Sequence, residues 1–375
     1  MKILFVATIS NTINAFLIPH IKFLINQGHE VDVACNIVSE IDTKIIELGC
    51  KVHNIEFQRI PLKKDNYKAY KKIGEIVKRE GYELVHTHTP IASFLVRLAC
   101  KSNLKVKILY TAHGFHFMKG APLKNWLLYY PMEKIAARWT DGIITINDED
   151  YILAKKLTLR KFNSVYKVNG VGIDMDKYQP ASNNEKCELR KKYGYKEEDF
   201  ILFYAAELNY NKHQDLLINS VNILKDKIPN VKLLLAGVGN LEEKYKNQVN
   251  DLQITQNVDF LGYCTEVHNF LRISDVGVSS SIREGLPVNV MEAMATGLPL
   301  VVTNCRGNAD LVNNNVNGYV VGIDNIEQFA NAIEGLYNSE DLRNQFGQIN
   351  IELVKKYSID NIKMEMNKIY GEWLN

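Results

Sequence analysis

Residues 276–304 read VGVSSSIREGLPVNVMEAMATGLPLVVTN, and this stretch contains the pattern that decides the fold. A short apolar run is followed by a polar turn, then by an apolar segment with helical spacing, and then by a second apolar run. Strand, helix and strand in this order are typical of a βαβ unit in a parallel sheet that is covered on both faces. Pro287 suits the first position of the helix, and Gly297 suits its end.

The same alternation extends over the whole chain. Strands are expected at 2–9, 29–35, 83–89, 106–113 and 142–147, and then at 199–208, 231–239, 258–263, 276–281, 299–304 and 318–322. Amphipathic segments such as 66–81 and 213–228 separate them. The sequence therefore predicts an α/β protein with two doubly wound, Rossmann-like domains that face a central cleft.

The domain boundary is expected where glycine, aspartate and proline interrupt the pattern, in VYKVNGVGIDMDKYQP at 165–180. A chain of 375 residues is too long for one compact core and suits two domains. We expect an N-terminal domain over 1–168, a C-terminal domain over 169–358, and a helix within 359–375 that crosses back to the N-terminal domain.

Composition narrows the class of protein. The chain is 46% hydrophobic and 23% charged, and its apolar runs are too short to span a bilayer. The first apolar run lacks a small-residue cleavage site, so we interpret it as a buried strand and expect a cytoplasmic protein. Six scattered cysteines without a CxxC motif favour reduced thiols over disulfides or a metal site.

Charge is distributed unevenly along the chain. Residues 1–168 carry 25 basic and 15 acidic side chains, whereas 169–375 carry 20 and 28. The basic residues concentrate in 58–80 and in 101–138. Such segments can be solvated helix faces, or they can attract the protein to an anionic membrane surface. Nucleic acid is not an expected partner, because no recognition motif accompanies the charge.

Two carboxylates flank the start of the helix expected after residue 286. Glu284 precedes the helix, and Glu292 lies about a turn and a half inside it. The amino end of a helix offers unpaired N–H groups and a positive dipole, which suit a phosphate. Carboxylates at two depths beside an anion site suit a nucleotide sugar, which has hydroxyls at both ends. An ordinary surface helix can show the same spacing.

In this context the chain resembles the retaining GT-B glycosyltransferases of glycosyltransferase family 4. Glu284 and Glu292, within GLP-x4-EAMA-x-GLP-x-V, match the family's E-x7-E element. The amino half, through HTHTPIAS, TAHGFHFMKG, YYPMEK and TDGIITINDED, is similar to members that build bacterial exopolysaccharides and capsules. The resemblance covers essentially the whole chain.

The resemblance implies roles for residues of the carboxyl half. Glu284 is expected to contact the donor sugar, Glu292 the ribose hydroxyls, and Lys212 the diphosphate. Glu207 stands where the family usually has arginine, so Arg283 or another base would supply a second positive charge. The other expected donor-binding residues are Asn211, Gly237, Gly239, Tyr263, Gly285, Leu286, Pro287 and Val288.

In the amino half, His113 follows a predicted strand, where an imidazole can donate a hydrogen bond to a sugar hydroxyl. The resemblance implies that His113 faces the reacting sugar, so His113 and Glu284 are the catalytic candidates. Candidates on the acceptor side are Asn14, in a segment expected to be a loop, and His116 and Glu133. Glu133 can also be a solvated helix charge.

His86 and His88 lie on one face of a predicted strand, which invites a metal interpretation. No third ligand has suitable spacing, and GT-B enzymes typically use no bound metal, so neither a metal nor a cofactor is expected.

These features indicate a retaining glycosyltransferase of surface polysaccharide biosynthesis. It would move a hexosyl or N-acetylhexosaminyl group from a nucleoside-diphosphate sugar, with UDP as the favoured nucleotide, to a polyprenyl-diphosphate-linked saccharide. The enzyme would sit peripherally on the inner face of the plasma membrane. Two alternatives remain open from the sequence: a UDP-sugar epimerase, and a non-catalytic nucleotide-sugar-binding subunit, which Glu207 would explain.

Overall fold

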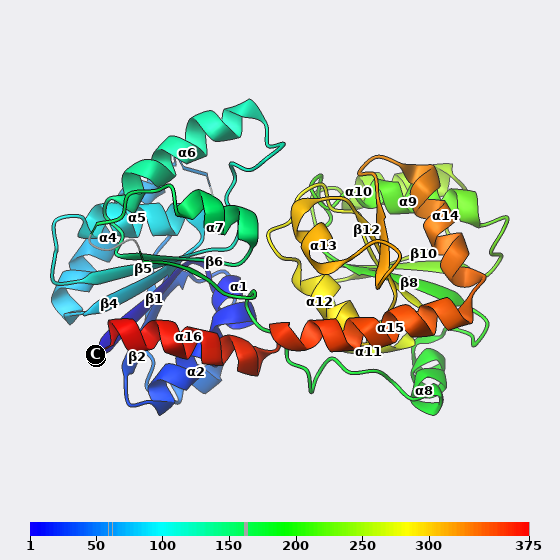
Figure 1. Ribbon diagram of the computed structural model, residues 1–375, viewed down its shortest axis with the longest axis horizontal. Coiled ribbons are helices and arrows are strands. Elements are labelled where there is room, and N and C mark those ends of the chain that lie inside the picture. Colours follow the sequence, from blue (N-terminus) through cyan, green and yellow to red (C-terminus); the bar gives the residue numbers. More distant parts are fainter. Residues whose placement is uncertain (59, 62, 161–163, 375) are drawn as a thin grey trace. The chain divides into compact units, whose positions relative to one another are not determined.

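The computed structural model describes residues 1–58, 60–61, 63–160 and 164–374 (Figure 1). The chain divides into two compact units. Unit 1 comprises Met1–Gly172 together with Ile359–Asn375, and unit 2 comprises Ile173–Ser358. Arg59, a member of the basic segment 58–80, lies outside the described residues.

Unit 1 contains a sheet of parallel strands in the order β3-β2-β1-β4-β5-β6-β7. Its strands are β1 (Lys2–Ile9), β2 (Glu30–Asn36), β3 (Val52–Asn54), β4 (Leu84–His88), β5 (Lys107–Ala112), β6 (Gly142–Thr145) and β7 (Ser164–Lys167). Its helices are α1 (Ser10–Thr12), the π-helix η1 (Ile13–Leu17), α2 (Ile18–Asn26), α3 (Thr43–Ile46), α4 (Asp65–Glu80), α5 (Pro90–Cys100), α6 (Leu123–Ala137), α7 (Asp148–Ala154) and α16 (Ile359–Trp373).

Unit 2 contains a second parallel sheet in the order β10-β9-β8-β11-β12-β13. Its strands are β8 (Phe200–Ala205), β9 (Val231–Ala236), β10 (Val258–Gly262), β11 (Val276–Ser279), β12 (Leu300–Thr303) and β13 (Gly318–Val321). Its helices are α8 (Asn183–Tyr193), α9 (Gln214–Leu224), α10 (Glu242–Asp251), α11 (Val267–Ile273), α12 (Val288–Ala295), α13 (Arg306–Leu311), α14 (Ile326–Tyr337), α15 (Glu340–Val354) and the 3₁₀ turn η2 (Lys355–Tyr357).

The central strands are buried on both faces. In β1 the side chains of residues 3–8 are all buried, and residues 200–204 of β8 are buried as well. Strands covered by helices on both sides need continuous apolar runs rather than alternation, which explains why these runs predicted strands correctly. Leu4 of β1 and Ile73 of α4 belong to one apolar core cluster of unit 1.

Each sheet has a point where the strand order reverses. In unit 1 it lies between β1 and β4, and in unit 2 between β8 and β11. Ligands of open α/β sheets bind outside the carboxyl ends of the strands at such a point. The residues that follow β8 and β11 are therefore the first place to look for a site.

The segment after β1 is helical, so the prediction that Asn14 lies in a loop is wrong. Helix α1 begins at Ser10, directly after the strand, and continues through η1 into α2. The N–H of Ile18 bonds to the carbonyl of Ile13, which is the wider spacing of a π-helix. Pro19 follows and has no N–H for the next helical bond, which explains why the chain widens here rather than breaking.

Two short strands, β3 and β7, are absent from the predicted set. β3 has three residues, and β7 overlaps the start of the segment 165–180 that was assigned to the domain boundary. In the described part of the chain, none of the helices combines the length and the apolar character that crossing a membrane requires.

Helix α16 packs against unit 1 and contacts α2 (Figure 1). Its Asn367 accepts a hydrogen bond at 3.0 Å from Gln27, the residue that follows α2. Its Trp373 covers Gly142, the first residue of β6. A Cβ atom on Gly142 would lie 2.7 Å from the Trp373 ring and 2.9 Å from Leu109. The glycine thus makes room for the last turn of the helix.

We expect Gly142→Ala to lower the free energy of unfolding of unit 1 by about 2 kcal/mol, because the added methyl group overpacks this contact. Urea unfolding followed by tryptophan fluorescence measures it selectively, since Trp126, Trp139 and Trp373 all belong to unit 1. Gly371→Ala is the control, because a Cβ there meets nothing within 4 Å. Equal stability of the Gly142→Ala and wild-type proteins would contradict the contact.

Candidate functional site

Helix α12 begins at Val288, one residue later than predicted, because Pro287 is its N-cap and has an extended backbone. The helix ends at Ala295, and Gly297 follows in the left-handed conformation with φ of 76°. No side chain among the described residues caps its amino end. The first-turn N–H groups are therefore available to an anion, as in many phosphate sites.

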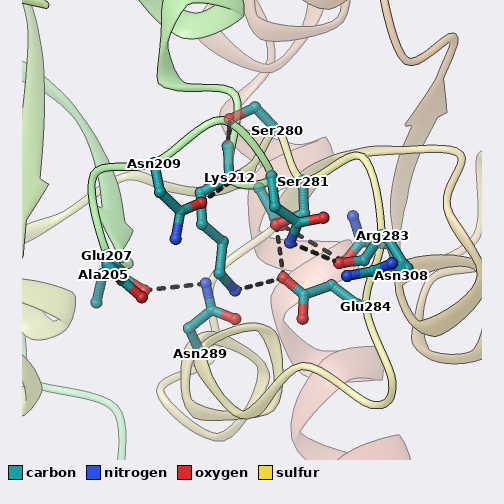
Figure 2. A network of polar contacts seen from close by, with 12 residues as sticks. Ala205, Glu207, Asn209, Lys212, Ser280, Ser281, Arg283, Glu284, Asn289 and Asn308 are labelled. Carbon is teal, nitrogen blue, oxygen red and sulfur yellow. Dashed lines mark hydrogen bonds and ion pairs between the residues drawn. The ribbon is translucent and has the colours of Figure 1, made fainter. Parts of the chain in front are cut away.

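Lys212 and Glu284 form an ion pair at the point where the strand order of unit 2 reverses (Figure 2). Lys212 Nζ lies 2.5 Å from Glu284 Oε1, and both side chains are largely buried. Burial opposes the ammonium charge, but the nearby Tyr204 hydroxyl and the Glu284 carboxylate outweigh it and raise the pKa of Lys212. Lys212 therefore stays positively charged, and within the pair its charge is balanced by the Glu284 carboxylate.

A chain of hydroxyl groups orients the carboxylate of this pair. Ser281 Oγ donates to Glu284 Oε1 at 2.6 Å, and the hydroxyl of Tyr204 lies 2.7 Å from Ser281 Oγ. Ser281 and Tyr204 are both buried. Sequence reasoning missed these two residues, although the triple serine that follows the buried run of β11 is an unusual pattern for a strand end.

The loops after β8 and β11 are joined by hydrogen bonds. Asn211 Nδ2 donates to the carbonyl of Arg283 at 3.0 Å, and its own carbonyl accepts from the Ile282 N–H at 2.8 Å. Ser280 Oγ donates to the carbonyl of Lys212 at 2.7 Å. Asn211, expected to bind the donor, thus joins the two loops that position the ion pair; a contact with the donor stays a prediction.

Gly237 and Gly239 follow β9 and lie against the loop after β8. A Cβ atom on Gly237 would come within 2.0 Å of the Ala206 carbonyl oxygen, and one on Gly239 within 2.2 Å of the Leu208 oxygen. Both glycines therefore let two loops approach each other closely. This packing role is additional to the nucleotide contact expected from the sequence, which stays a prediction.

Glu292 lies in the second turn of α12, in a largely apolar environment. It borders a small pocket whose other lining residues include Phe203 and Leu271. Burial raises the pKa of Glu292 to about 7, although a hydrogen bond from Tyr178 and the charge of Lys177 act in the opposite direction. The carboxyl group therefore takes up a proton at higher pH than an ordinary glutamate does.

The remaining donor-binding candidates are distributed around this site. Tyr263 follows β10 and is 79% exposed, whereas Leu286 and Pro287 are buried. Val288 is the first residue of α12. A Cβ on Gly307 would come within 2.7 Å of the carbonyl of Gly285, so these two segments also pack closely.

Two cations lie near Glu284 in addition to Lys212. The Nε of Arg306 donates to the carbonyl of Glu284 at 3.3 Å, and Arg283 precedes Glu284 in the chain. Glu207 is exposed, and its carbonyl accepts a hydrogen bond from Gln214 at 3.0 Å. The loop that carries Glu207 thus contributes a positive charge through Lys212. Arg283 and Arg306 contribute positive charges from neighbouring segments.

In unit 1, His113 directly follows β5 at the carboxyl edge of the sheet. Its Nε2 lies 3.1 Å from Nδ1 of His88, the last residue of β4. Burial, and to a smaller extent the nearby His20, lower the pKa of His113 to about 4. The imidazole is therefore neutral at physiological pH.

Two acceptor-side candidates have partners inside unit 1. Asn14 Nδ2 donates to the carbonyl of Glu40 at 2.7 Å, and its Oδ1 accepts from the Asp42 N–H at 3.2 Å. The ring of His116 lies 4.5 Å from that of Tyr129, centroid to centroid. These contacts fix both side chains near the sheet edge, and their contact with an acceptor stays a prediction.

Glu133 is not a solvated helix charge, so that interpretation is wrong. It is buried in α6 and forms an ion pair with Arg97 of α5, whose second guanidinium nitrogen donates to Glu133 Oε2 at 3.2 Å. The guanidinium also lies 4.3 Å from the centre of the Tyr110 ring. A buried arginine needs such a counter-charge, and the lone arginine in the apolar segment PIASFLVRLAC was the signal for it.

Comparison with known proteins decides the family. The model of "Glycosyl transferases group 1" matches residues 185–352, and that of "Glycosyl transferase 4-like" matches residues 2–147. The Bacillus subtilis protein named "Putative glycosyltransferase EpsD" is 40% identical over 376 residues, which cover 100% of this chain and 97% of EpsD. The chain belongs to the group 1 glycosyltransferases. It is a glycosyltransferase of the GT-B type.

Two further proteins resemble this glycosyltransferase. An Escherichia coli "UDP-Gal:alpha-D-GlcNAc-diphosphoundecaprenol alpha-1,3-galactosyltransferase" is 31% identical over 283 residues, 74% of this chain and 71% of that protein. The crystal structure of Anabaena HepE in complex with UDP and glucose matches with a TM-score of 0.82 at 17% identity, covering 99% of this chain and 100% of HepE. The predicted GT-B fold is thereby confirmed, and the epimerase alternative is set aside in favour of glycosyl transfer.

The environment of Glu292 in this glycosyltransferase leads to a prediction about the pKa of its carboxyl group. We expect the carboxyl group to titrate near pH 7, and Tyr178→Phe to raise its pKa further, because the tyrosine hydroxyl stabilises the ionised form. Carbon-13 NMR of glutamate-labelled protein measures both values, with Glu292→Gln to assign the signal. A midpoint near the ordinary value of 4.5 would contradict the desolvated environment.

Proposed function

We propose that this glycosyltransferase transfers a sugar from a UDP-sugar donor to a polyprenyl-diphosphate-linked saccharide, with retention of the anomeric configuration. The observation that carries the proposal is the Lys212–Glu284 ion pair beside the amino end of α12, at the reversal point of unit 2. The UDP in the HepE complex supports the nucleotide, and the name of the Escherichia coli relative supports a lipid-linked acceptor.

Donor binding exchanges the partners of this pair. The diphosphate takes Lys212 and the free N–H groups of α12, which releases the Glu284 carboxylate to accept hydrogen bonds from sugar hydroxyls. Glu292, in its ionised form, accepts hydrogen bonds from the ribose hydroxyls. Arg306 and Arg283 supply the second positive charge that Glu207 cannot provide.

The transfer step breaks the bond between the anomeric carbon and the diphosphate oxygen. Negative charge grows on the departing diphosphate, and Lys212 with the end of α12 stabilises it without a metal or cofactor. The acceptor oxygen attacks from the same face, and its proton passes to the leaving phosphate oxygen. Neutral His113 donates a hydrogen bond to the reacting sugar. Hexose and N-acetylhexosamine both fit this scheme.

The acceptor requires that the enzyme work at a membrane surface, and α6 suits this role. Leu123 and Leu127 of this helix are 74% and 70% exposed, and Leu128 and Ile135 are exposed as well. Figure 1 shows α6 at the periphery of unit 1, outside α5. Leucines at the surface of a helix insert into the boundary between headgroups and acyl chains.

The charges around these leucines favour an anionic membrane. Lys124 and Lys134 are exposed on α6, and Arg138 follows it, whereas the acidic residue of the helix, Glu133, is buried. The aromatic residues of the same segment point the other way, since Trp126 and Tyr130 pack against the core of unit 1. The leucine face therefore attaches the enzyme peripherally to the cytoplasmic side of the plasma membrane, where its nucleotide sugar is available.

Calorimetry with UDP tests the donor site. Lys212→Met should weaken UDP binding by about 10- to 100-fold, the loss expected when a charge-assisted hydrogen bond is removed. Lys244→Met, which changes an exposed lysine of α10, is the matched control. Glu284→Gln should bind UDP at least as tightly as the wild type, because UDP then does not have to break the ion pair between Lys212 and the Glu284 carboxylate. Unchanged UDP binding in Lys212→Met would refute the proposed site.

Transfer itself is measured with radiolabelled UDP-sugars and bacterial lipid extracts. Glu284→Gln should reduce transfer by about 100-fold despite intact UDP binding, since the contact to the sugar is lost. Full activity of Glu284→Gln would contradict its role. Tight UDP binding without turnover on any lipid fraction would favour the binding-subunit alternative, and proton NMR of the product reports whether the anomeric configuration is retained.

Co-sedimentation with vesicles tests the membrane face. Leu127→Glu should weaken binding to phosphatidylglycerol vesicles by about tenfold or more, since burial of one leucine is worth about 2 kcal/mol. Leu104→Glu, at an exposed leucine before β5, is the control and should bind like the wild type. Equal binding of wild type and Leu127→Glu, or equal binding to neutral and anionic vesicles, would overturn the membrane assignment.

A further inference from the structure

Three histidines form a column at the carboxyl edge of the sheet of unit 1. His86 and His88 lie on the same face of β4, and His113 follows the neighbouring strand β5. The centroids of the His86 and His88 rings are 4.3 Å apart, and those of His88 and His113 are 5.3 Å apart. The column leads from the interior of the sheet to the candidate catalytic imidazole.

The inner end of the column is fixed by hydroxyl groups. His86 Nδ1 lies 2.8 Å from the hydroxyl of Tyr370, on α16, and His86 Nε2 lies 2.7 Å from that of Thr111. Hydroxyl groups can donate as well as accept, so these bonds hold the ring without deciding its tautomer. His88 packs on this fixed ring and on the ring of Phe5, 5.8 Å away centroid to centroid.

The contact between His88 and His113 joins two ring nitrogens, so one must donate and the other accept. Nδ1 of His88 lies 3.1 Å from Nε2 of His113. The other nitrogen of His88, Nε2, is buried and has no hydrogen-bond partner among the described residues. Each neutral imidazole carries one N–H, and that single proton decides the direction of the bond.

The unpartnered nitrogen favours one of the two directions. If His113 were the donor, His88 would carry its own proton on Nε2, as a buried N–H without an acceptor. If His88 is the donor, the unpartnered atom is only an acceptor. Orphaned buried N–H groups are rarer in folded proteins than under-satisfied acceptors. The proton of His88 therefore belongs on Nδ1, and the Nε2 of His113 accepts it.

Both rings are neutral, so this assignment applies at physiological pH. Burial lowers the pKa of His88 well below its ordinary value and that of His113 to about 4. The titratable groups that face them are His86, on the same strand, and His20, on α2. These neighbours also have pKa values lowered by burial, so the column carries no charge that would reverse the tautomers.

We propose that His88 is a positioning residue that holds His113 in the tautomer protonated on Nδ1. This nitrogen then acts toward the reacting sugar as a hydrogen-bond donor and cannot accept a proton. The role toward sugar rests on the proposed function, whereas the tautomer follows from the contacts within unit 1 alone. A His113 that cannot act as a base requires another proton acceptor, and the leaving phosphate oxygen fills that role.

Nitrogen-15 NMR of histidine-labelled full-length protein tests the tautomer without any assay of activity. Long-range proton–nitrogen spectra distinguish protonated from unprotonated ring nitrogens, and His113→Gln identifies the His113 signals. We expect protonated Nδ1 and unprotonated Nε2 at neutral pH. The opposite pattern, or a doubly protonated ring, would overturn the proposal. Because this measurement uses the wild-type protein, failure of a variant to fold does not affect it.

A matched pair of variants tests the consequence for transfer. His88→Gln retains an N–H that can donate to His113, whereas His88→Met has a similar length and shape but no donor. In His88→Met we expect Nδ1 of His113 to lose its proton and kcat to fall about tenfold. The magnitude is taken by analogy from metal sites, where removing the group that orients a histidine costs about tenfold or more. His88→Gln should retain both properties.

Equal losses in the Gln and Met variants would show a packing role and overturn the proposal. If the expected tautomer is observed but no transferase activity is found with any donor, the proposed function fails and the assignment of His88 stands. If transfer is observed and His113 has the other tautomer, the proposed function stands and the assignment of His88 fails.

Discussion

The ion pair between Lys212 and Glu284 is the interaction on which the proposed donor site of this glycosyltransferase depends. It joins the loops that follow two adjacent strands of the sheet, and its two residues are 72 positions apart in the chain. At an effective dielectric constant near 20, two such charges attract each other by about 4 kcal/mol at 4 Å. A ligand that takes the lysine must offer a comparable anion, and one that offers only hydroxyls leaves the pair intact. In the proposed donor site, the pair would therefore favour ligands that carry both an anion and hydroxyl groups.

The two units solve different electrostatic problems. Around Lys212 the protein keeps fixed charges, which match a departing diphosphate. Around His113 it keeps imidazoles neutral by burial, so that the sheet edge of unit 1 offers hydrogen bonds without a charge. Charges on one sheet edge and neutral donors on the other correspond to the two partners of the proposed reaction, an anionic leaving group and an uncharged sugar.

Much of the fold could be predicted from the sequence because the central strands are continuous apolar runs. The helix α12 could be placed within one residue for the same reason, since its apolar spacing lies between Pro287 and Gly297. The local pattern did not contain the partners of polar side chains. Glu133 forms an ion pair with Arg97, which is 36 positions away in the chain. His86 forms a hydrogen bond with Tyr370, which is 284 positions away. Such pairs depend on how distant elements pack, which a single sequence does not display.

The position of helix α16 in the chain has a consequence for the order in which the two units fold. Unit 2 is one continuous stretch of chain, whereas unit 1 contains the first and the last residues of the described sequence. Domains generally fold as units in the order of their synthesis. Here residues 1–172 of unit 1 are synthesised before unit 2 but wait for α16, which follows unit 2, because Tyr370 and Trp373 contact His86 and the segment at Gly142. A nascent chain therefore completes the folding of unit 2 before that of unit 1.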